Sequence, residues 1–295
     1  MSLHDLDFMR TPAEELVPRH YPRYVDFGMQ GYLATKAFGG PLLLKGAKGT
    51  GKTMGIEEFA ASADIPIVRH PCTEEDTARD LYGTFVEEGV FGLGSMTTAI
   101  DVANSEGACI LVFEEINALS PRAQKMLNPL TDHRQEVTIQ KIGRSFRVDQ
   151  DKMLWVIGTM NPNYAGTYDL NEDLLSRFTV VDVGFMPKKQ EMDILDTEWE
   201  FAFERQLDTR SRVAIKGLYD LATYTRSNAV GYALSTRDLV TTIRSWAQHD
   251  SMAKALLELS GKYEKIGLDE FKKRTASGLK INLDEVTLWA APEGS

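Results

Sequence analysis

The sequence predicts an α/β fold with a parallel, doubly wound sheet, followed by a smaller helical domain. Five short apolar runs are typical of strands covered on both faces: residues 41–45, 66–70, 108–113, 153–159 and 179–183. Helical patterns separate these runs, and this alternation favours a parallel sheet. After Met186-Pro187 the patterns are helical, without a convincing strand. We therefore expect an α/β core over residues 1–186 and a helical domain with a C-terminal extension over residues 187–295.

Individual elements can be predicted in chain order. Residues 26–38 have the pattern of a short helix before the first strand. Ser120 and Pro121 suit the N-cap and first position of a helix whose apolar residues are Ala123, Met126, Leu127 and Leu130. Three apolar helix faces follow in the second domain, around Trp199, Leu218 and Ile243. An alternation of apolar residues predicts a last strand or hairpin, at Ile281, Leu283, Val286 and Leu288.

A glycine-rich loop follows the first strand. Residues 46–53 fit the pattern G-x-x-x-x-G-K-[ST] of a phosphate-binding P-loop. Backbone N–H groups of such a loop and of the following helix hold phosphates, Lys52 reaches the outer phosphates, and Thr53 binds Mg²⁺. An accidental match in a glycine-rich turn is the alternative, and the preceding strand counts against it. We expect phosphate contacts from Gly46, Ala47, Lys48, Gly49, Thr50, Gly51, Lys52, Thr53 and Met54.

Two carboxylates end the apolar run at 108–113. Glu114 and Glu115 would lie at a strand tip, near the phosphates if the sheet is parallel. There, Glu114 can hold Mg²⁺ and Glu115 can polarise an attacking water. Two acidic residues that merely cap the next helix are the alternative, which the glycine loop makes weaker.

Asn161 and Arg177 follow or precede later strands. Asn161 stands at the tip of the run 153–159, where its amide can orient the water and touch the terminal phosphate; a plain turn before Pro162 is the alternative. Arg177 comes just before the run 179–183. It is either a surface charge or a group that stabilises transition-state charge on a nucleotide held by a neighbouring subunit.

Arg237 falls in the first turn of a predicted helix, because Ser235-Thr236-Arg237-Asp238 has the capping form [ST]-x-x-[DE]. The helix dipole disfavours a cation at that position. A nearby phosphate would remove this conflict, whereas an exposed salt bridge to Asp238 is the alternative.

Together these residues resemble the Walker A, Walker B, sensor 1, arginine finger and sensor 2 elements of the AAA+ ATPases, in that order along residues 41 to about 248. The segment 83–99 is similar to an insertion of the MoxR-like group, and residues 130–148 to its hairpin before sensor 1. Thr159-Met160-Asn161-Pro162 and Ser235-Thr236-Arg237 are similar to the CbbQ/NorQ/GvpN-like branch, of dynein-related (AAA_5) type. One departure is Glu114, where the family usually has Asp.

The resemblance implies an ATPase with ATP and Mg²⁺ as cofactors. It also implies a homo-oligomeric ring, usually hexameric, that remodels a client protein complex, commonly with a partner that carries a von Willebrand factor A domain. Arg177, and more weakly Arg134, would act across the subunit interface. Loops such as 89–94 would face a central pore, with Phe91 touching the client.

Composition and charge count against several other classes of protein. A formal charge of −10 without a basic cluster argues against direct nucleic-acid binding. There is no apolar stretch of membrane-spanning length and no secretory signal pattern, so we expect a cytoplasmic protein. Cys72 and Cys109 should lie at opposite ends of their parallel strands and remain unpaired. The scattered histidines predict no metal site built from protein ligands alone.

Two alternative functions remain open at this point. One is a GTP- or ATP-driven motor subunit of a restriction or antiphage system, similar to McrB, although its asparagine motif differs from Met160-Asn161-Pro162. The other is a nucleotide-binding scaffold without hydrolysis, which Glu114 makes credible.

Overall fold

The computed structural model describes residues 6–23, 25–26, 28–162, 166–228 and 231–288. These residues fall into two compact units. The first is drawn from residues 1–22, 28–47 and 51–184, and the second from residues 23–27, 48–50 and 185–295. Within the described residues, no helix combines the length and the apolar composition that crossing a bilayer requires.

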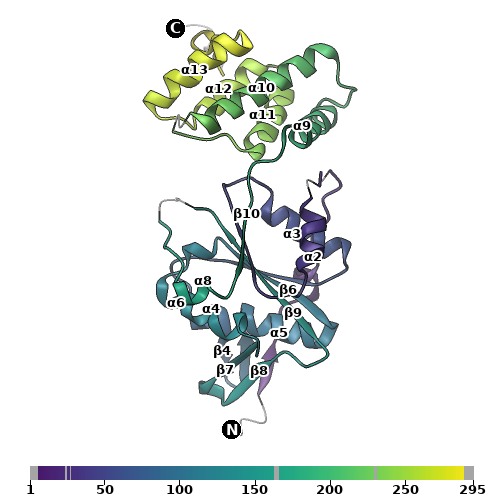
Figure 1. The fold of residues 1–295 in the computed structure, drawn as a ribbon, viewed down its shortest axis with the longest axis vertical. Coiled ribbons are helices and arrows are strands. Elements are labelled where there is room, and N and C mark those ends of the chain that lie inside the picture. Colours follow the sequence, from purple (N-terminus) through teal and green to yellow (C-terminus); the bar gives the residue numbers. More distant parts are fainter. Residues whose placement is uncertain (1–5, 24, 27, 163–165, 229–230, 289–295) are drawn as a thin grey trace. The chain divides into compact units, whose positions relative to one another are not determined.

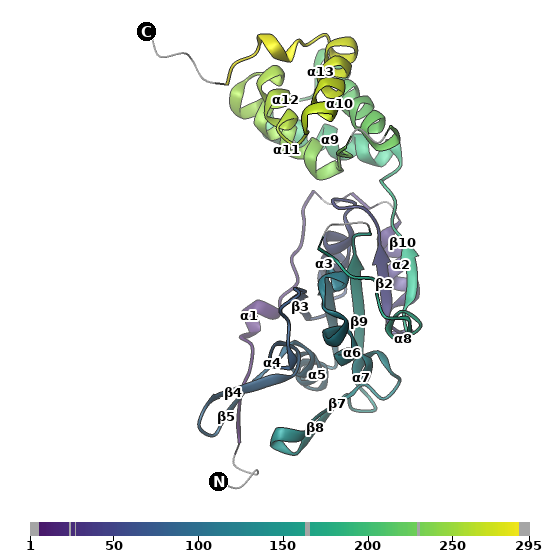
Figure 2. The ribbon, with the colours of Figure 1, turned by 90° about the vertical axis from the view of Figure 1, so that its left-hand side faces the viewer.

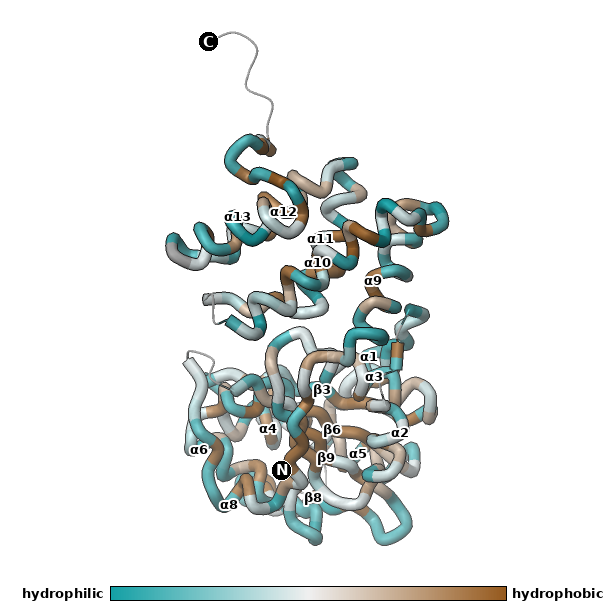
Figure 3. Tube along the Cα trace, turned by 45° about the horizontal axis from the view of Figure 1, so that its top comes forward, coloured by the Kyte–Doolittle hydropathy of each residue, from teal (hydrophilic) through white to brown (hydrophobic). Residues whose placement is uncertain are grey.

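A five-stranded parallel sheet forms the centre of the first unit (Figure 1). Its strand order is β10 (Thr179–Asp182), β2 (Leu42–Lys45), β9 (Met153–Met160), β6 (Ala108–Glu114), β3 (Ile67–Pro71). All five apolar runs of the sequence are thus strands of one sheet, which confirms the predicted fold class. The central strands β2, β6 and β9 are almost completely buried, because helices cover both faces of the sheet. Their apolar residues lie at the middle of the unit (Figure 3).

The helices of the first unit precede or connect its strands. They are α1 (Ala13–Leu16), α2 (Met29–Lys36), α3 (Lys52–Ser62), α4 (Ala78–Tyr82), α5 (Ser95–Glu106), α6 (Pro121–Met126), α7 (Asn128–Thr131) and α8 (Glu172–Leu175). Ser120 caps α6 by accepting a hydrogen bond from the Ala123 amide, and Pro121 is its first residue, as predicted. The predicted helix is interrupted, however, at Leu127. Pro129 lies in the first turn of α7 and cannot donate the backbone bond that a continuous helix needs.

A hairpin separates α4 from α5 and projects from the first unit (Figure 2). It consists of β4 (Gly83–Glu87) and β5 (Val90–Leu93), and β1 (Asp7–Met9) pairs with β5 in parallel. The expectation that Phe91 is exposed to a client is wrong. Phe91 is only 1% exposed, because its ring packs against the rings of Phe8 and Phe85. Phe85 and its neighbour Val86 are instead 45% and 46% exposed.

A second hairpin and the cysteines also agree with the predicted arrangement. The hairpin joins β7 (Glu136–Ile139) and β8 (Arg144–Arg147). Cys72 follows the end of β3, whereas Cys109 lies at the start of the neighbouring strand β6. Both are buried free thiols.

The second unit consists of helices α9 (Lys188–Phe203), α10 (Thr209–Ser227), α11 (Thr236–His249), α12 (Met252–Ser260) and α13 (Lys265–Leu279). Trp199, Leu218 and Ile243 lie in its core, as the predicted apolar faces require. The predicted last strand is wrong for the residues that the structure describes. Leu283–Glu285 form a 3-10 turn whose Asp284 amide donates to the side chain of Asn282, and Leu283 packs into the helical core.

Candidate nucleotide-binding site

The glycine loop connects β2 to α3, as the sequence predicts. Gly46 follows β2 directly, and its amide donates to the Met160 carbonyl at 3.0 Å. A Cβ at Gly46 would lie 2.1 Å from the Val183 carbonyl oxygen, so only glycine fits there. Gly51 precedes α3 with a φ of +85°, a left-handed conformation that favours glycine. The loop therefore needs glycine at both positions for steric reasons.

Other residues of the predicted phosphate-binding segment differ in exposure. Thr50 is buried, Thr53 is partly buried in the first turn of α3, and the exposed residues are Ala47, Lys48 and Met54. Backbone N–H groups in the first turn of α3 have no partner within that helix and can hold an anion.

Lys52, the first residue of α3, directs its ammonium group back into the loop. Its Nζ donates to the carbonyl oxygens of Gly46 and Ala47 at 2.8 and 2.9 Å. It also donates to Asn161 Oδ1 at 2.9 Å. Lys52 is 7% exposed, so a positive charge is held within the loop next to the end of β9.

Asn161 links Lys52 to Glu115. Its Nδ2 donates to Glu115 Oε1 at 3.0 Å, while its Oδ1 accepts from Lys52. The backbone carbonyl of Asn161 accepts from Asn117 Nδ2 at 3.0 Å, which fixes the residue just after β9. A chain of side chains therefore runs from the cation of the loop to the carboxylate at the tip of β6, as expected for residues at the carboxyl ends of adjacent parallel strands.

Glu115 has an unusual backbone conformation. Its φ of +54° lies in the left-handed region, which costs a non-glycine residue about 1–3 kcal/mol. Its amide donates to Thr159 Oγ1 at 3.2 Å and its carbonyl accepts from Ala118 N at 2.7 Å. These bonds hold the strained residue so that its carboxylate meets Asn161. Strain of this kind is concentrated at functional sites.

Glu114 ends β6 in a half-buried position. Burial raises the pKa of its carboxyl group above the ordinary value, and the negative charge of Glu57 adds to this, while Arg69 acts the other way. Arg69 is itself paired with Glu57 at 2.6 Å. A carboxyl group in this situation is stabilised in its charged form by a bound cation.

Arg177 lies in a separate cluster on Asp132. Its guanidinium is 3.5 Å from Asp132 Oδ2 and 3.4 Å from Asp173 Oδ1. Arg134 shares Asp132 at 3.5 Å, and the hydrogen bond from the Arg134 amide is the main cause that lowers the pKa of Asp132. Arg177 Nε is buried and has no hydrogen-bond partner among the described residues. The structure thus brings the two predicted interface arginines together, but not into contact with Lys52, Asn161 or Glu115.

Arg237 belongs to the second unit, where it is exposed in the first turn of α11. The capping box between Ser235 and Asp238 is present, as predicted. Burial acts to raise the pKa of Asp238, but hydrogen bonds from Lys262 and Ser235 outweigh it and lower that pKa. Asp238, which follows Arg237 in the chain, is therefore anchored by side-chain contacts.

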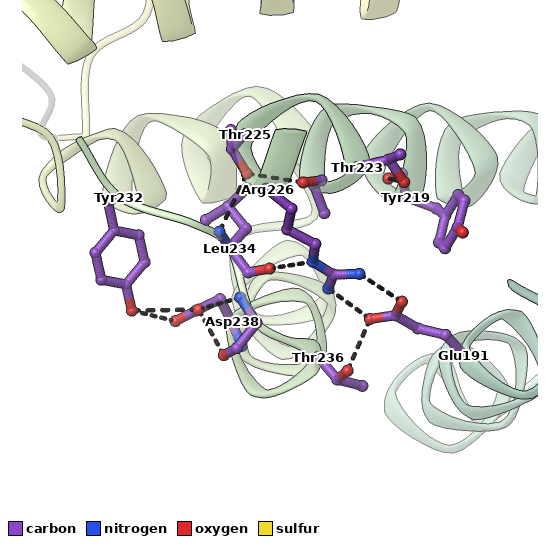
Figure 4. A network of polar contacts seen from close by, with 11 residues as sticks. Glu191, Tyr219, Thr223, Thr225, Arg226, Tyr232, Leu234, Thr236 and Asp238 are labelled. Carbon is purple, nitrogen blue, oxygen red and sulfur yellow. Dashed lines mark hydrogen bonds and ion pairs between the residues drawn. The ribbon is translucent and has the colours of Figure 1, made fainter. Parts of the chain in front are cut away.

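A buried ion pair supports this end of α11 (Figure 4). Glu191 on α9 accepts two hydrogen bonds from Arg226 on α10, at 2.7 and 2.8 Å, and one from Thr236 at 2.7 Å. Arg226 also donates to the Leu234 carbonyl at 2.6 Å, just before the cap of α11. The pair therefore joins three helices around the segment that carries Arg237.

Arg226→Ala is expected to destabilise the second unit by about 3–5 kcal/mol, because Glu191 is 0% exposed and would keep an unpaired charge. Arg244→Ala is the matched control, since that arginine is 54% exposed and Glu198 retains Arg23 as a partner. Its expected cost is about 1 kcal/mol or less. Urea unfolding, with hydrogen exchange of α10 and α11 amides, measures both. Equal losses would contradict this role of the pair.

Two buried amides that the sequence did not reveal hold loops of the first unit. Asn117 is 1% exposed and holds Asn161, as described above. Gln124 is 0% exposed, donates to the carbonyls of Leu119 and Asp169, and accepts from the Asn171 amide. Both hold loops that come from distant parts of the sequence. The sequence offered a signal for Gln124 alone, an amide inside an apolar helical pattern.

Comparison with known proteins agrees with this geometry. Residues 41–178 match the family described as "AAA domain (dynein-related subfamily)". Protein CbbQ of Hydrogenophilus thermoluteolus is 26% identical over 204 residues, which are 68% of this chain and 72% of that protein. Protein NorQ of Paracoccus denitrificans is 29% identical over 202 residues, 66% of this chain and 72% of that protein.

A solved structure, NtrX of Brucella abortus, aligns with a TM-score of 0.52 at 16% identity, covering 77% of this chain and 52% of that one. This likeness concerns the fold alone. The resemblance predicted from the motifs is confirmed by the family match and by the sequence relatives. Over residues 41–178 the chain therefore carries an AAA domain of the dynein-related subfamily.

Proposed function

We propose that the protein is a Mg²⁺-dependent ATPase that remodels or matures a partner protein complex. The observation that carries this proposal is the chain of contacts Lys52–Asn161–Glu115 beside the glycine loop. It joins a cation suited to phosphates with a carboxylate suited to activating water. Hydrolysis of a phosphoanhydride needs little more from a protein than such positioning and charge stabilisation.

Each residue has a distinct role in this proposal. Residues 46–54 surround the phosphates, and Lys52 exchanges its loop carbonyls for the outer phosphates. Thr53 and Glu114 hold Mg²⁺. Glu115 polarises the attacking water, which Asn161 orients. Arg237 contacts a phosphate, which removes its conflict with the helix dipole.

We further propose a homo-oligomeric ring, hexameric as the resemblance implies. Arg177 is held by Asp132 and Asp173 and not by the glycine loop of its own chain. This arrangement suits an arginine that serves a neighbouring subunit. Closure of a repeated, heterologous interface produces a ring. The ring, together with a partner that carries a von Willebrand factor A domain, would then remodel a client complex. The exposed Phe85 and Val86 replace Phe91 as the residues that we expect to touch the client.

Turnover of ATP and GTP by the wild-type chain over a range of protein concentrations tests this proposal. ATP hydrolysis whose specific activity rises with concentration is expected, because each site needs two subunits. A clear preference for GTP would favour a restriction-type motor. Tight nucleotide binding without turnover would favour a scaffold, which Glu114 in place of the usual Asp makes credible.

A further inference from the structure

Three side chains with metal-binding atoms lie together at the carboxyl end of β3. None of them is assigned to the nucleotide. They are His70, Cys72 and Asp76, and their ligand atoms all lie within 4.8 Å of one another. His70 and Cys72 are each 8% exposed, and Asp76 is partly buried. The sequence predicted no metal site built from protein ligands alone, whereas the fold brings these three side chains together.

The backbone around the cluster holds the three side chains in place. His70 Nε2 is 3.0 Å from Asp76 Oδ2, and the Thr73 amide donates to the same oxygen at 2.8 Å. The Cys72 amide donates to the Glu114 carbonyl at 2.9 Å, which attaches the turn to the tip of β6. The His70 ring also packs edge-on against Phe113. His70 is therefore fixed by its strand, Cys72 by a backbone bond to the end of β6, and Asp76 by a turn.

The donor set has a definite chemical preference. An imidazole nitrogen, a thiolate sulfur and a carboxylate oxygen are all ligands of Zn²⁺, whereas Mg²⁺ selects oxygen ligands. The bound thiolate and carboxylate would carry two negative charges, which match a divalent cation. Glu114 and Glu115 add further negative charge nearby. Arg69, on the same strand, is paired with Glu57.

We propose that His70, Cys72 and Asp76 bind one Zn²⁺ or a similar borderline-soft divalent cation, with a water in the fourth position. The bound cation would tie the turn that carries Asp76 to the end of β3, which the Cys72 amide joins to the Glu114 carbonyl. The site shares no ligand with the proposed Mg²⁺ position and does not depend on nucleotide hydrolysis. Its test can therefore fail while the proposed function stands, and the reverse also holds.

Titration of the full-length, metal-free protein with Co²⁺ tests the site, because Co²⁺ bound to a thiolate has a charge-transfer absorption band. One Co²⁺ per chain is expected to bind with this band, which Zn²⁺ should remove and excess Mg²⁺ should leave unchanged. Cys72→Ser should lose the band. Asp76→Asn should weaken Zn²⁺ binding about 100-fold or more, since even outer-shell changes cost 10–100-fold. Cys109→Ser is the matched control, as its buried thiol lies at the other end of the neighbouring strand, and it should keep the band.

Several results would overturn the proposal. They are no thiolate band in the wild type, a band that survives Cys72→Ser, a band lost in Cys109→Ser, or displacement by Mg²⁺. Circular dichroism shows whether Cys72→Ser is folded. If it is not, Asp76→Asn decides, and unchanged Zn²⁺ affinity in that variant contradicts the site.

Discussion

Glu115→Gln is expected to reduce ATP turnover by about 10²–10⁴-fold while leaving nucleotide affinity nearly unchanged. Gln cannot accept the proton of the attacking water. It keeps an oxygen that accepts from Asn161 Nδ2, so the chain of contacts to Lys52 is preserved. The variant should therefore bind ATP and accumulate in the bound state.

Steady-state turnover and equilibrium binding of ATP separate these two effects. Glu106→Gln is the control, since Glu106 is exposed at the end of α5 and should behave as the wild type. Turnover of the Glu115→Gln variant at the wild-type rate would remove the catalytic assignment of Glu115. A parallel loss of affinity would instead indicate a structural role.

Arg177→Ala should lower turnover by about 10³–10⁵-fold, the usual contribution of an arginine supplied by a neighbouring subunit. Nucleotide affinity should change little, because Arg177 makes no described contact with the glycine loop of its own chain. Loss of its ion pairs with Asp132 and Asp173 should cost little stability, since such partly exposed pairs contribute about 0–1 kcal/mol. Arg122→Ala, on the exposed side of α6, is the matched control.

Mixed assemblies reveal whether the arginine acts in trans. A complex that contains both Glu115→Gln and Arg177→Ala chains, isolated by a different affinity tag on each, should regain turnover relative to either variant alone. At some interfaces the intact Glu115 of one chain meets the intact Arg177 of the other. Absence of any recovery in such mixed complexes would contradict shared active sites.

The sequence was sufficient to predict the parallel sheet and most of the candidate site. The central strands are continuous apolar runs, because both of their faces are buried. Strand ends carry Glu114, Glu115 and Asn161, so parallel topology alone brings these residues to one edge. The glycine at 46 is explained by the close Val183 carbonyl, which no local pattern could have shown.

The predictions that were wrong depend on tertiary packing. Phe91 lies on a strand whose inner face is covered by Phe8 of β1, and three residues of an N-terminal strand carry too weak a signal to be recognised. Residues 281–288 alternate as a strand would, yet the described residues of the second unit are helical and form no sheet that could pair with them. The grouping of His70, Cys72 and Asp76 could not be predicted either, because these residues lack a familiar metal-binding spacing. The turn after β3 brings Asp76 back to the strand end.

Binding of Mg²⁺ and a non-hydrolysable ATP analogue, measured by calorimetry, tests the central claim most directly. Lys52→Ala should weaken this binding about 10–100-fold, because a charge-assisted contact to phosphate of about 1.5–3 kcal/mol is lost. Lys125→Ala, which removes an exposed lysine of α6, should leave binding unchanged. If the Lys52→Ala variant binds the analogue as tightly as the wild type, the nucleotide does not occupy the glycine loop.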